Sequence, residues 1–435
     1  MITFKNIKEE KEYRELANAF QIKEDLLIQK EDGYIKVNDT SVKLPNLDIY
    51  EKKKITHALY QAFYQRYQKN LAWGSLVGVN PLKLIDRVGD EETLLSFYFI
   101  QKDKIALAKK ILSFQKEYKE SIQEDFSLYI NIPFCPSKCI YCSYPTYPQD
   151  ESLMDQYVLA LCREIEVSSQ FYSNPPTAIY IGGGTPSALG QKRLEKILRT
   201  IHKYFQKPRE CTVEIGRADT IDKDLLLMLK KNGVDRISIN PQTMQDDTLK
   251  LIQRKGSFEE ILKAFHLAKE IGFEDINMDL IMGLPSEKPE DFAASLEKIA
   301  QLSPSSLSIH CLALKKGSQL FEENWNPKVS GAFEGVRDQF TEEHNYYPYY
   351  LYRQKHMVLA SENIGYVKKG FFGLYNIAMM EDLQDILALG LAASSKKIGK
   401  RIKRHMNYRR LKDYLENLDQ DIQEKRLLFQ ADEIA

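Results

Sequence analysis

Short apolar segments alternate with amphipathic helical segments, and this alternation constrains the fold more than any other feature of the sequence. Six segments rich in β-branched and aromatic residues recur at steps of about 25 to 50 residues. Between them, residues 151–171 and 193–205 space their apolar side chains by three and four, which predicts helices. Such strand–helix–strand repeats form parallel sheets with right-handed crossovers. The spacing alone leaves an open barrel and a doubly wound sheet as alternatives. The expected strands are residues 127–132, 178–181, 211–215, 236–240, 276–281 and 307–312.

The rest of the chain predicts two further regions. A length of 435 residues favours two or three domains. We expect an N-terminal α+β domain over 1–123, an α/β core over 124–320 and a mixed α/β C-terminal region over 321–435. Asp32-Gly33 predicts a hairpin turn in the first domain. Residues 408–429 predict one late helix in the last region.

Charge and hydropathy exclude some classes of function. Lys plus Arg total 61 and Asp plus Glu total 61, so the formal net charge is zero. This balance argues against nucleic-acid binding, which needs a basic excess or patch. No segment resembles a signal peptide or a membrane-spanning helix. We therefore expect a cytoplasmic protein, in which clustered cysteines are metal ligands or redox groups rather than disulfides.

Three of the six cysteines lie close together after the first expected strand, in YINIPFCPSKCIYC (129–142). Thiolates select zinc, copper(I) or iron–sulfur clusters. A structural zinc site needs four ligands, and no fourth Cys or His lies nearby in sequence. Three thiolates suit a 4Fe–4S cluster with one open iron. We interpret Cys162, Cys211 and Cys311 as buried small apolar residues, and the candidate ligands are Cys135, Cys139 and Cys142.

Polar residues or glycines follow several of the other strands, where chemistry is expected in a barrel. GGGTPSAL after the second strand is either a ligand-binding turn or a tight turn. Glu214 is suited to accept hydrogen bonds from sugar hydroxyls, with a solvated strand-end charge as the alternative. Arg254 is suited to bind a carboxylate, with a surface ion pair as the alternative. Asp279 within an apolar strand needs a partner, which favours a functional role.

The spacing Cys-x3-Cys-x2-Cys, with Tyr141 before the third cysteine, resembles the radical S-adenosylmethionine (radical SAM) superfamily. The resemblance implies a partial (β/α)6 barrel similar to a TIM barrel. It also implies a 4Fe–4S cluster whose open iron is chelated by S-adenosylmethionine. The residues that would contact this cofactor are Tyr129, Tyr141, Gly183, Gly184, Thr185, Glu214, Gln242, Arg254, Asp279 and Ala313.

Within the superfamily, the order of these motifs resembles the branch of oxygen-independent coproporphyrinogen III dehydrogenase, also called oxidase. Residues 125–320 match this branch well. The whole chain is most similar to the Firmicute variant with an extra N-terminal domain, through LAWGSLVGVNPLKL (71–84) and VEIGRAD (213–219). Two positions differ from the best-studied branch: Asn131 replaces a His, and Tyr144 replaces a Cys. Whether one or two molecules of S-adenosylmethionine bind stays open.

The resemblance implies oxidative decarboxylation of two propionates of coproporphyrinogen III to vinyl groups, giving protoporphyrinogen IX. A deoxyadenosyl radical removes the hydrogen atom, so no side chain acts as acid or base. The implied partners are the tetrapyrrole substrate and an electron donor such as flavodoxin or ferredoxin. Arg353 and Lys355, beside a cluster of tyrosines, are candidates to hold a propionate. Two alternatives remain: a haem-binding carrier, and an enzyme that methylates and opens the haem ring.

Overall fold

The computed structural model describes residues 2–8, 11–20, 22, 24–78, 80–122, 126–325, 332–359 and 361–430. The chain divides into two compact units. The first comprises Met1–Phe114 and Leu351–Glu362, and the second comprises Gln115–Tyr350 and Asn363–Ala435. The boundary expected between residues 123 and 124 lies outside the described residues, and the three-domain division stays a prediction.

The second unit is built on an eleven-stranded sheet with the order β11-β12-β10-β9-β8-β7-β6-β5-β13-β14-β15. Strands β5 to β10 are parallel neighbours in sequence order. A doubly wound sheet reverses its strand order at a switch point, so this order excludes that alternative. The fold is the expected partial (β/α)6 barrel. Its strands are β5 (Phe126–Ile132), β6 (Ala178–Gly183), β7 (Glu210–Gly216), β8 (Arg236–Ile239), β9 (Asp275–Met282) and β10 (Ser306–Cys311).

Additional strands extend the sheet at both ends. β12 pairs antiparallel with β10, whereas β13 pairs parallel with β5. β14 and β15 continue the sheet in antiparallel fashion. The C-terminal region therefore completes the sheet on both sides of the barrel strands. The bounds of these strands are β11 (Tyr347–Tyr352), β12 (Asn363–Val367), β13 (Asp385–Leu389), β14 (Ser394–Lys397) and β15 (Lys403–Met406).

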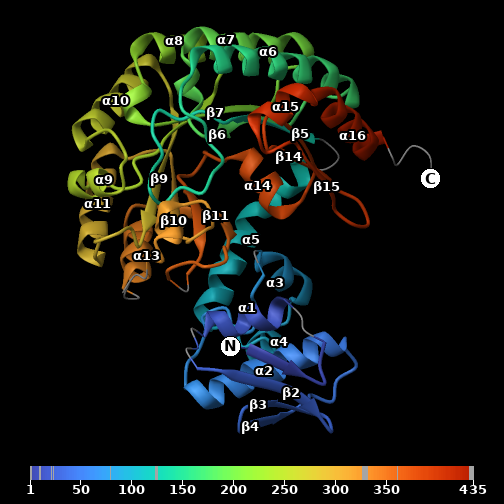
Figure 1. Ribbon diagram of the computed structural model, residues 1–435. Helices are drawn as coiled ribbons and strands as arrows, with labels where there is room; N and C mark the ends of the chain where they lie inside the picture. Colours follow the sequence, from blue (N-terminus) through green and yellow to red (C-terminus); the bar gives the residue numbers. More distant parts are fainter. Residues whose placement is uncertain are drawn as a thin grey trace. The chain divides into compact units, whose positions relative to one another are not determined.

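Helices that follow the barrel strands form an outer arc around the sheet (Figure 1). They pack because each has one apolar face; α7 buries Leu194, Ile197, Leu198 and Ile201. Their amphipathic spacing thus explains the layer order, with helices outside and strands inside. The helices of this unit are α6 (Glu151–Ser168), α7 (Gln191–Tyr204), α8 (Lys223–Lys231), α9 (Asp246–Leu251), α10 (Phe258–Ile271), α11 (Pro289–Leu302), α12 (Gln319–Glu322), α13 (Phe333–Glu343) and α14 (Leu374–Glu381).

The late helix predicted over 408–429 is two helices, α15 (Leu411–Glu416) and α16 (Leu418–Gln430). The break falls at Asn417, whose backbone is not helical and whose side chain donates to the carbonyl of Asp413 at 3.0 Å. An asparagine side chain that hydrogen-bonds to the backbone in this way competes with the backbone hydrogen bonds that would continue the helix. The prediction of a single helix was therefore wrong.

The first unit contains a four-stranded sheet in the order β1-β2-β3-β4. The predicted hairpin joins β2 and β3, and Asp32 and Gly33 have φ of 47° and 79°. Positive φ at both positions is typical of the two-residue hairpin turn that an Asp-Gly pair favours. The elements are β1 (Ile2–Lys5), α1 (Lys11–Ala19), β2 (Leu26–Glu31), β3 (Tyr34–Val37), β4 (Thr40–Lys43), α2 (Glu51–Tyr67), α3 (Leu82–Val88), α4 (Glu91–Ser96) and α5 (Lys102–Ile122), which continues into the second unit.

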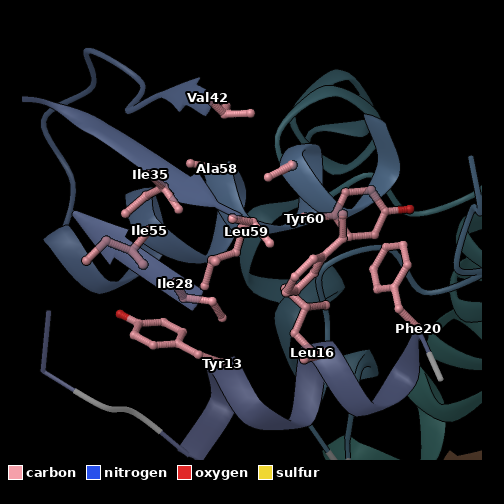
Figure 2. Packing of buried hydrophobic residues seen from close by; sticks show 14 of the residues in the cluster. Tyr13, Leu16, Phe20, Ile28, Ile35, Val42, Ile55, Ala58, Leu59 and Tyr60 are labelled. Carbon is pink, nitrogen blue, oxygen red and sulfur yellow. The ribbon is translucent and has the colours of Figure 1, made fainter. Parts of the chain in front are cut away.

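The apolar core of the first unit lies between this sheet and helices α1 and α2. Figure 2 shows Tyr13 and Leu16 from α1 facing Ile28 from β2 and Leu59 from α2. These four side chains are at most 1% exposed. Among the described residues of the whole chain, no helix is long and apolar enough to cross a membrane.

Candidate functional site

The residues predicted to form the site all belong to the second unit, except Arg353 and Lys355. Tyr129 lies on β5, and the three cysteines occupy the loop after it. Gly183 ends β6, Glu214 lies on β7 and Asp279 lies on β9. Because the barrel strands are parallel, the loops that follow them meet at one edge of the sheet.

The cysteine loop and the glycine-rich turn contact each other directly. The Gly184 amide donates to the carbonyl of Ile132 at 2.7 Å, and the Thr185 amide donates to that of Phe134 at 2.8 Å. The Cys135 thiol lies 3.4 Å from the Thr185 hydroxyl. The turn after β6 therefore supports the first cysteine, and its role in binding a ligand stays a prediction.

Close packing explains why this turn consists of glycines. Gly183 has φ of +114°, and a Cβ there would lie 2.2 Å from Oδ1 of Asn131. A Cβ on Gly184 would lie 2.7 Å from the carbonyl of Phe134 and 3.0 Å from Sγ of Cys135. Any larger residue would push the cysteine loop away from the strand end.

Replacing Gly183 with alanine should destabilise the second unit by roughly 2–4 kcal/mol, because it adds both a backbone strain and a clash. Gly190→Ala is a matched control, since Gly190 has φ of +78° but no atom within 4 Å of its Cβ position. It should cost only about 1 kcal/mol. Urea unfolding of both variants measures the difference. Equal midpoints would contradict the steric explanation.

Arg254 follows α9 and reaches the second cysteine. Its Nη1 lies 3.8 Å from Sγ of Cys139, and its Nη2 donates to the carbonyls of Gly216, at 2.9 Å, and Asn240. The guanidinium therefore ties the ends of β7 and β8 to the cysteine loop. The positive charge of this half-buried guanidinium favours a thiolate or another anion beside it.

Tyr141, Cys135 and Cys142 are half-buried. Burial raises the pKa of the Tyr141 hydroxyl well above its usual value. Burial also raises the pKa of the Cys135 and Cys142 thiols. Partial burial of the cysteine loop therefore disfavours the charged forms of these groups in the absence of a bound metal.

Glu214 begins a hydrogen-bonded chain across the barrel interior. Its two carboxylate oxygens accept from the Asn240 amide at 3.0 Å and from the Tyr180 hydroxyl at 3.3 Å. The chain continues through Ser238 to Asn277, whose amide donates to Asp279 at 2.7 Å. Side chains from four consecutive strands therefore link the two predicted acidic residues.

The pKa values of the two carboxyl groups are shifted in opposite directions. Burial and the nearby Asp279 raise the pKa of Glu214 to about 7. Burial opposes ionisation of Asp279, but its interactions with His310, Asn277 and Ser308 outweigh that cost and lower its pKa. Nε2 of His310 lies 3.9 Å from Asp279. Opposite pKa shifts of two linked carboxyl groups are typical of functional sites.

A second group of polar side chains surrounds Tyr129. Its hydroxyl lies 3.1 Å from Oδ1 of Asn131 and 3.2 Å from the hydroxyl of Tyr144. Tyr144 also donates to Oδ1 of Asn131 at 2.7 Å. The two positions that differ from the best-studied branch therefore contact each other, and Tyr129, Tyr180 and Tyr375 stack beside them with centroids 4.8–6.2 Å apart.

Gln242 and Ala313 lie where the sequence places them, after β8 and β10. Gln242 has φ of 69°, and its amide donates to the carbonyl of Asp279 at 2.8 Å. Leu312, next to Ala313, donates to the carbonyl of Met282 at 3.0 Å. Both residues are half-buried at the same sheet edge.

Sequence reasoning did not identify Tyr180, Asn240, His310 or Tyr375 as site residues. Three of these four residues could have been recognised from the sequence. Tyr180 and His310 are polar residues at alternate positions of otherwise apolar strands, and Asn240 directly follows a buried one. Tyr375 has no local signal, because α14 brings it to β6 from about two hundred residues away.

Arg353 and Lys355 belong to the first unit. Arg353 donates to the carbonyl of Leu76 at 2.6 Å, and Lys355 pairs with Glu15. Their predicted role in holding a propionate stays a prediction.

The three cysteines outside the cysteine loop were predicted to be buried. Cys211 and Cys311 are buried as expected. Cys162 is half-buried, and its thiol accepts a hydrogen bond from the Thr200 hydroxyl.

The donor set fits a 4Fe–4S cluster. Three thiols lie on one loop, and the described residues contain no group of three or more Cys, His, Asp or Glu already arranged around a single metal position. A cubane takes each thiolate on a different iron, so the thiols need not converge on one point. Glycine amides and a carboxyl group adjoin the loop, as a bound nucleoside requires.

Comparison with known proteins agrees with this site. Residues 129–299 match the model of the radical SAM superfamily. Coproporphyrinogen III oxidase (HemN) from Escherichia coli, a radical SAM enzyme, has the same fold, with a TM-score of 0.56, 24% identity and coverage of 71% of this chain and 73% of that one. The fold and the site therefore define a radical SAM protein, and a 4Fe–4S cluster and S-adenosylmethionine are its cofactors.

Two relatives show to which branch of the radical SAM superfamily this chain is similar. The oxygen-independent coproporphyrinogen-III oxidase-like protein HemZ of Bacillus subtilis (strain 168) is 35% identical over 81% of this chain and 76% of its own length. The heme chaperone HemW of the same organism is 33% identical over 43% of this chain and 51% of its own. This chain belongs to the branch of oxygen-independent coproporphyrinogen III oxidases and their relatives.

Proposed function

We propose that this chain converts propionate side chains of coproporphyrinogen III to vinyl groups without oxygen, giving protoporphyrinogen IX. The observation that carries the proposal is the meeting of three thiols, a glycine turn and two linked carboxyl groups at one sheet edge. The similarity to HemZ over most of both chains supports a tetrapyrrole substrate.

In this proposal the chain holds both cofactors through the residues identified from sequence. Cys135, Cys139 and Cys142 ligate the cluster. Glu214 accepts hydrogen bonds from the ribose, and Arg254 contacts the carboxylate of S-adenosylmethionine. The remaining contacts to S-adenosylmethionine are Tyr129, Tyr141, Gly183, Gly184, Thr185, Gln242, Asp279 and Ala313.

When bound, the cluster and S-adenosylmethionine supply the radical chemistry that removes one hydrogen atom from a substrate propionate. The protein contributes position and exclusion of water. The partly buried thiols and the interior network from Glu214 to Asp279 would limit the access of solvent and fix the nucleoside. No side chain acts as acid or base. A flavodoxin or ferredoxin is the proposed electron donor.

The similarity to HemW supports a second candidate, a haem carrier without turnover. The two functions make opposite predictions. Anaerobically reconstituted protein is incubated with coproporphyrinogen III, S-adenosylmethionine and a reductant, and the products are separated chromatographically. Vinyl products support decarboxylation. Stoichiometric binding in a separate titration with haem, together with unchanged coproporphyrinogen III in this assay, supports the carrier and overturns the proposal.

Glu214→Gln should weaken S-adenosylmethionine binding by about 10- to 100-fold, because an amide offers one acceptor where the carboxylate offers two. The same change should stabilise the protein without ligand. Below pH 4.5 the raised pKa of Glu214 does not lower the free energy of unfolding, because the carboxyl group is protonated in both the folded and the unfolded chain. The cost grows as pH rises toward about 7 and is complete above it.

We therefore expect Glu214→Gln to raise the free energy of unfolding by on the order of 2 kcal/mol at pH 8 and by almost nothing at pH 4.5. Urea unfolding at both pH values and calorimetric titration with S-adenosylmethionine measure the two effects. Asp224→Asn, on α8, is a control that should change neither. Unchanged ligand affinity in Glu214→Gln would remove the ribose contact from the proposal.

A further inference from the structure

The segment VEIGRAD (213–219) contains two charged residues to which the proposed reaction gives no role. This segment is one of the two motifs through which the chain is similar to the variant with an extra N-terminal domain, and only Glu214 within it is a proposed contact to S-adenosylmethionine. The other two charged residues, Arg217 and Asp219, directly follow β7. They are therefore candidates for a further role at the carboxyl edge of the sheet.

Arg217 is almost completely buried and pairs with Asp219. The side chain of Arg217 is 3% exposed, and that of Asp219 is 18% exposed. Nε and Nη2 of Arg217 donate to Oδ1 and Oδ2 of Asp219, both at 2.9 Å. This pairing through two hydrogen bonds fixes the position and the orientation of the guanidinium.

The third nitrogen of the guanidinium contacts the cysteine loop. Nη1 of Arg217 donates to the hydroxyl of Ser137 at 2.9 Å and to the carbonyl of Ser137 at 3.3 Å. Ser137 lies two residues after Cys135 and two residues before Cys139. A buried positive charge is therefore held against the cysteine loop between the first two cluster ligands.

The backbone that carries Arg217 is itself fixed. Gly216 turns the chain at the end of β7 with φ of +80°. The Thr220 hydroxyl donates to the carbonyl of Arg217 at 2.8 Å and lies 2.6 Å from the hydroxyl of Ser187, which follows the glycine-rich turn. The positive charge therefore has a defined place relative to the cysteine loop.

A fixed charge beside a redox centre changes its reduction potential. Reduction adds one negative charge to a cluster, so a nearby cation favours the reduced form and a nearby anion opposes it. Net charge is one of the factors that set the reduction potentials of iron–sulfur clusters. The effect is larger in a partly buried site than in water, because the effective dielectric constant is lower there.

We infer that Arg217 and Asp219 set the reduction potential of the 4Fe–4S cluster, with Arg217 favouring the reduced form and Asp219 limiting that effect. Asp219 and Ser137 bind different nitrogens of the guanidinium, so the cation contacts the cysteine loop directly and the carboxylate acts beside it. The inference concerns the cluster and not the substrate. Its test therefore needs no tetrapyrrole, and its outcome is independent of the proposed decarboxylation.

The midpoint potential of the anaerobically reconstituted protein tests the inference, followed by electron paramagnetic resonance without substrate. Arg217→Met removes the cation and leaves Asp219, so reduction should become at least tenfold less favourable, which is a potential about 59 mV more negative for one electron. Asp219→Asn removes the anion and leaves Arg217, so we expect a shift in the opposite direction. The double variant Arg217→Met/Asp219→Asn should return close to the wild-type potential, although it lacks the hydrogen bonds to Ser137.

The pair between Arg236 and Asp275 provides a matched control. These side chains are 3% and 19% exposed, almost the same as the first pair. They begin β8 and β9, and so lie at the sheet edge opposite the cysteine loop. Asp275→Asn should therefore leave the midpoint potential unchanged, even where it lowers the free energy of unfolding.

The direction of the shifts separates a charge effect from a structural one. Shifts in the same direction in Arg217→Met and Asp219→Asn, or no shift in either, would overturn the inference. A double variant that keeps the full shift of Arg217→Met would also contradict it, because the lost hydrogen bonds would then explain the change. If Arg217→Met does not hold four irons, Asp219→Asn decides alone: a more positive potential supports the inference, and an unchanged or more negative one overturns it.

Discussion

Cys139→Ala should yield a folded protein that lacks the 4Fe–4S cluster and leaves coproporphyrinogen III unchanged. The cluster needs three thiolates, and two cannot hold a cubane against loss to solvent. Anaerobically purified wild type should be brown with about four irons per chain, whereas the variant should be colourless. Iron analysis, the visible spectrum and product chromatography measure the three effects.

Cys162→Ala is the matched control, because Cys162 is a half-buried cysteine on α6 whose thiol accepts a hydrogen bond from the Thr200 hydroxyl. It should keep the full iron content and turnover. A complete cluster in Cys139→Ala, or its loss in Cys162→Ala, would assign the wrong thiols. Colourless, zinc-loaded wild type would contradict both the cluster and the proposed function.

The sequence predicts best those parts of the site whose residues lie close together along the chain. Cys135, Cys139 and Cys142 share one loop, and their neighbours in the barrel follow strands whose apolar character is visible in the sequence. The strand pattern alone did not decide between a barrel and a doubly wound sheet. The resemblance supplied that choice, and the consecutive order of β5 to β10 confirms it.

The contacts that the sequence does not predict join residues far apart along the chain. Asn131 donates to the carbonyl of Leu391 at 2.6 Å, and Tyr375 stacks on Tyr180 with centroids 4.8 Å apart. The first contact depends on β13 pairing with β5 and the second on α14 packing against β6, and no local pattern specifies either arrangement. The break at Asn417 was not predicted for a different reason: the apolar spacing that indicates a helix continues across it.

The predicted role of Arg353 in holding a propionate stays a prediction, and the structure shows only to which unit this residue belongs. Its place beside a tyrosine cluster suggested a contact in the reaction site. Tyr349 and Tyr350 are buried in β11 and belong to the second unit, whereas Arg353 belongs to the first. Neighbours in sequence therefore serve different units here, because the chain passes from one to the other between residues 350 and 351.

Lys425→Met should lower the stability of the second unit by about 3–5 kcal/mol, the largest loss that we expect from any single substitution outside the site. Lys425 on α16 pairs with Glu164 on α6, and both side chains are 0% exposed. Glu164 also accepts from the Tyr414 hydroxyl at 2.6 Å, the Asn407 amide at 2.7 Å and the Gly390 amide at 2.8 Å. Removing the lysine leaves a buried carboxylate without its counter-charge. Thermal unfolding should show a midpoint about 5–12 °C lower.

The double variant Glu164→Gln/Lys425→Met separates the charge from the packing. A neutral amide keeps an acceptor for these donors, and methionine fills most of the space of lysine, so the double variant should recover more than half of the loss. Lys263→Met removes an exposed pair with Glu259 and should shift the midpoint by less than about 1 °C. If Lys425→Met proves as mild as Lys263→Met, the ion pair does not hold α16 against α6. If the double variant is no more stable than the single one, the loss comes from packing rather than from an unpaired charge.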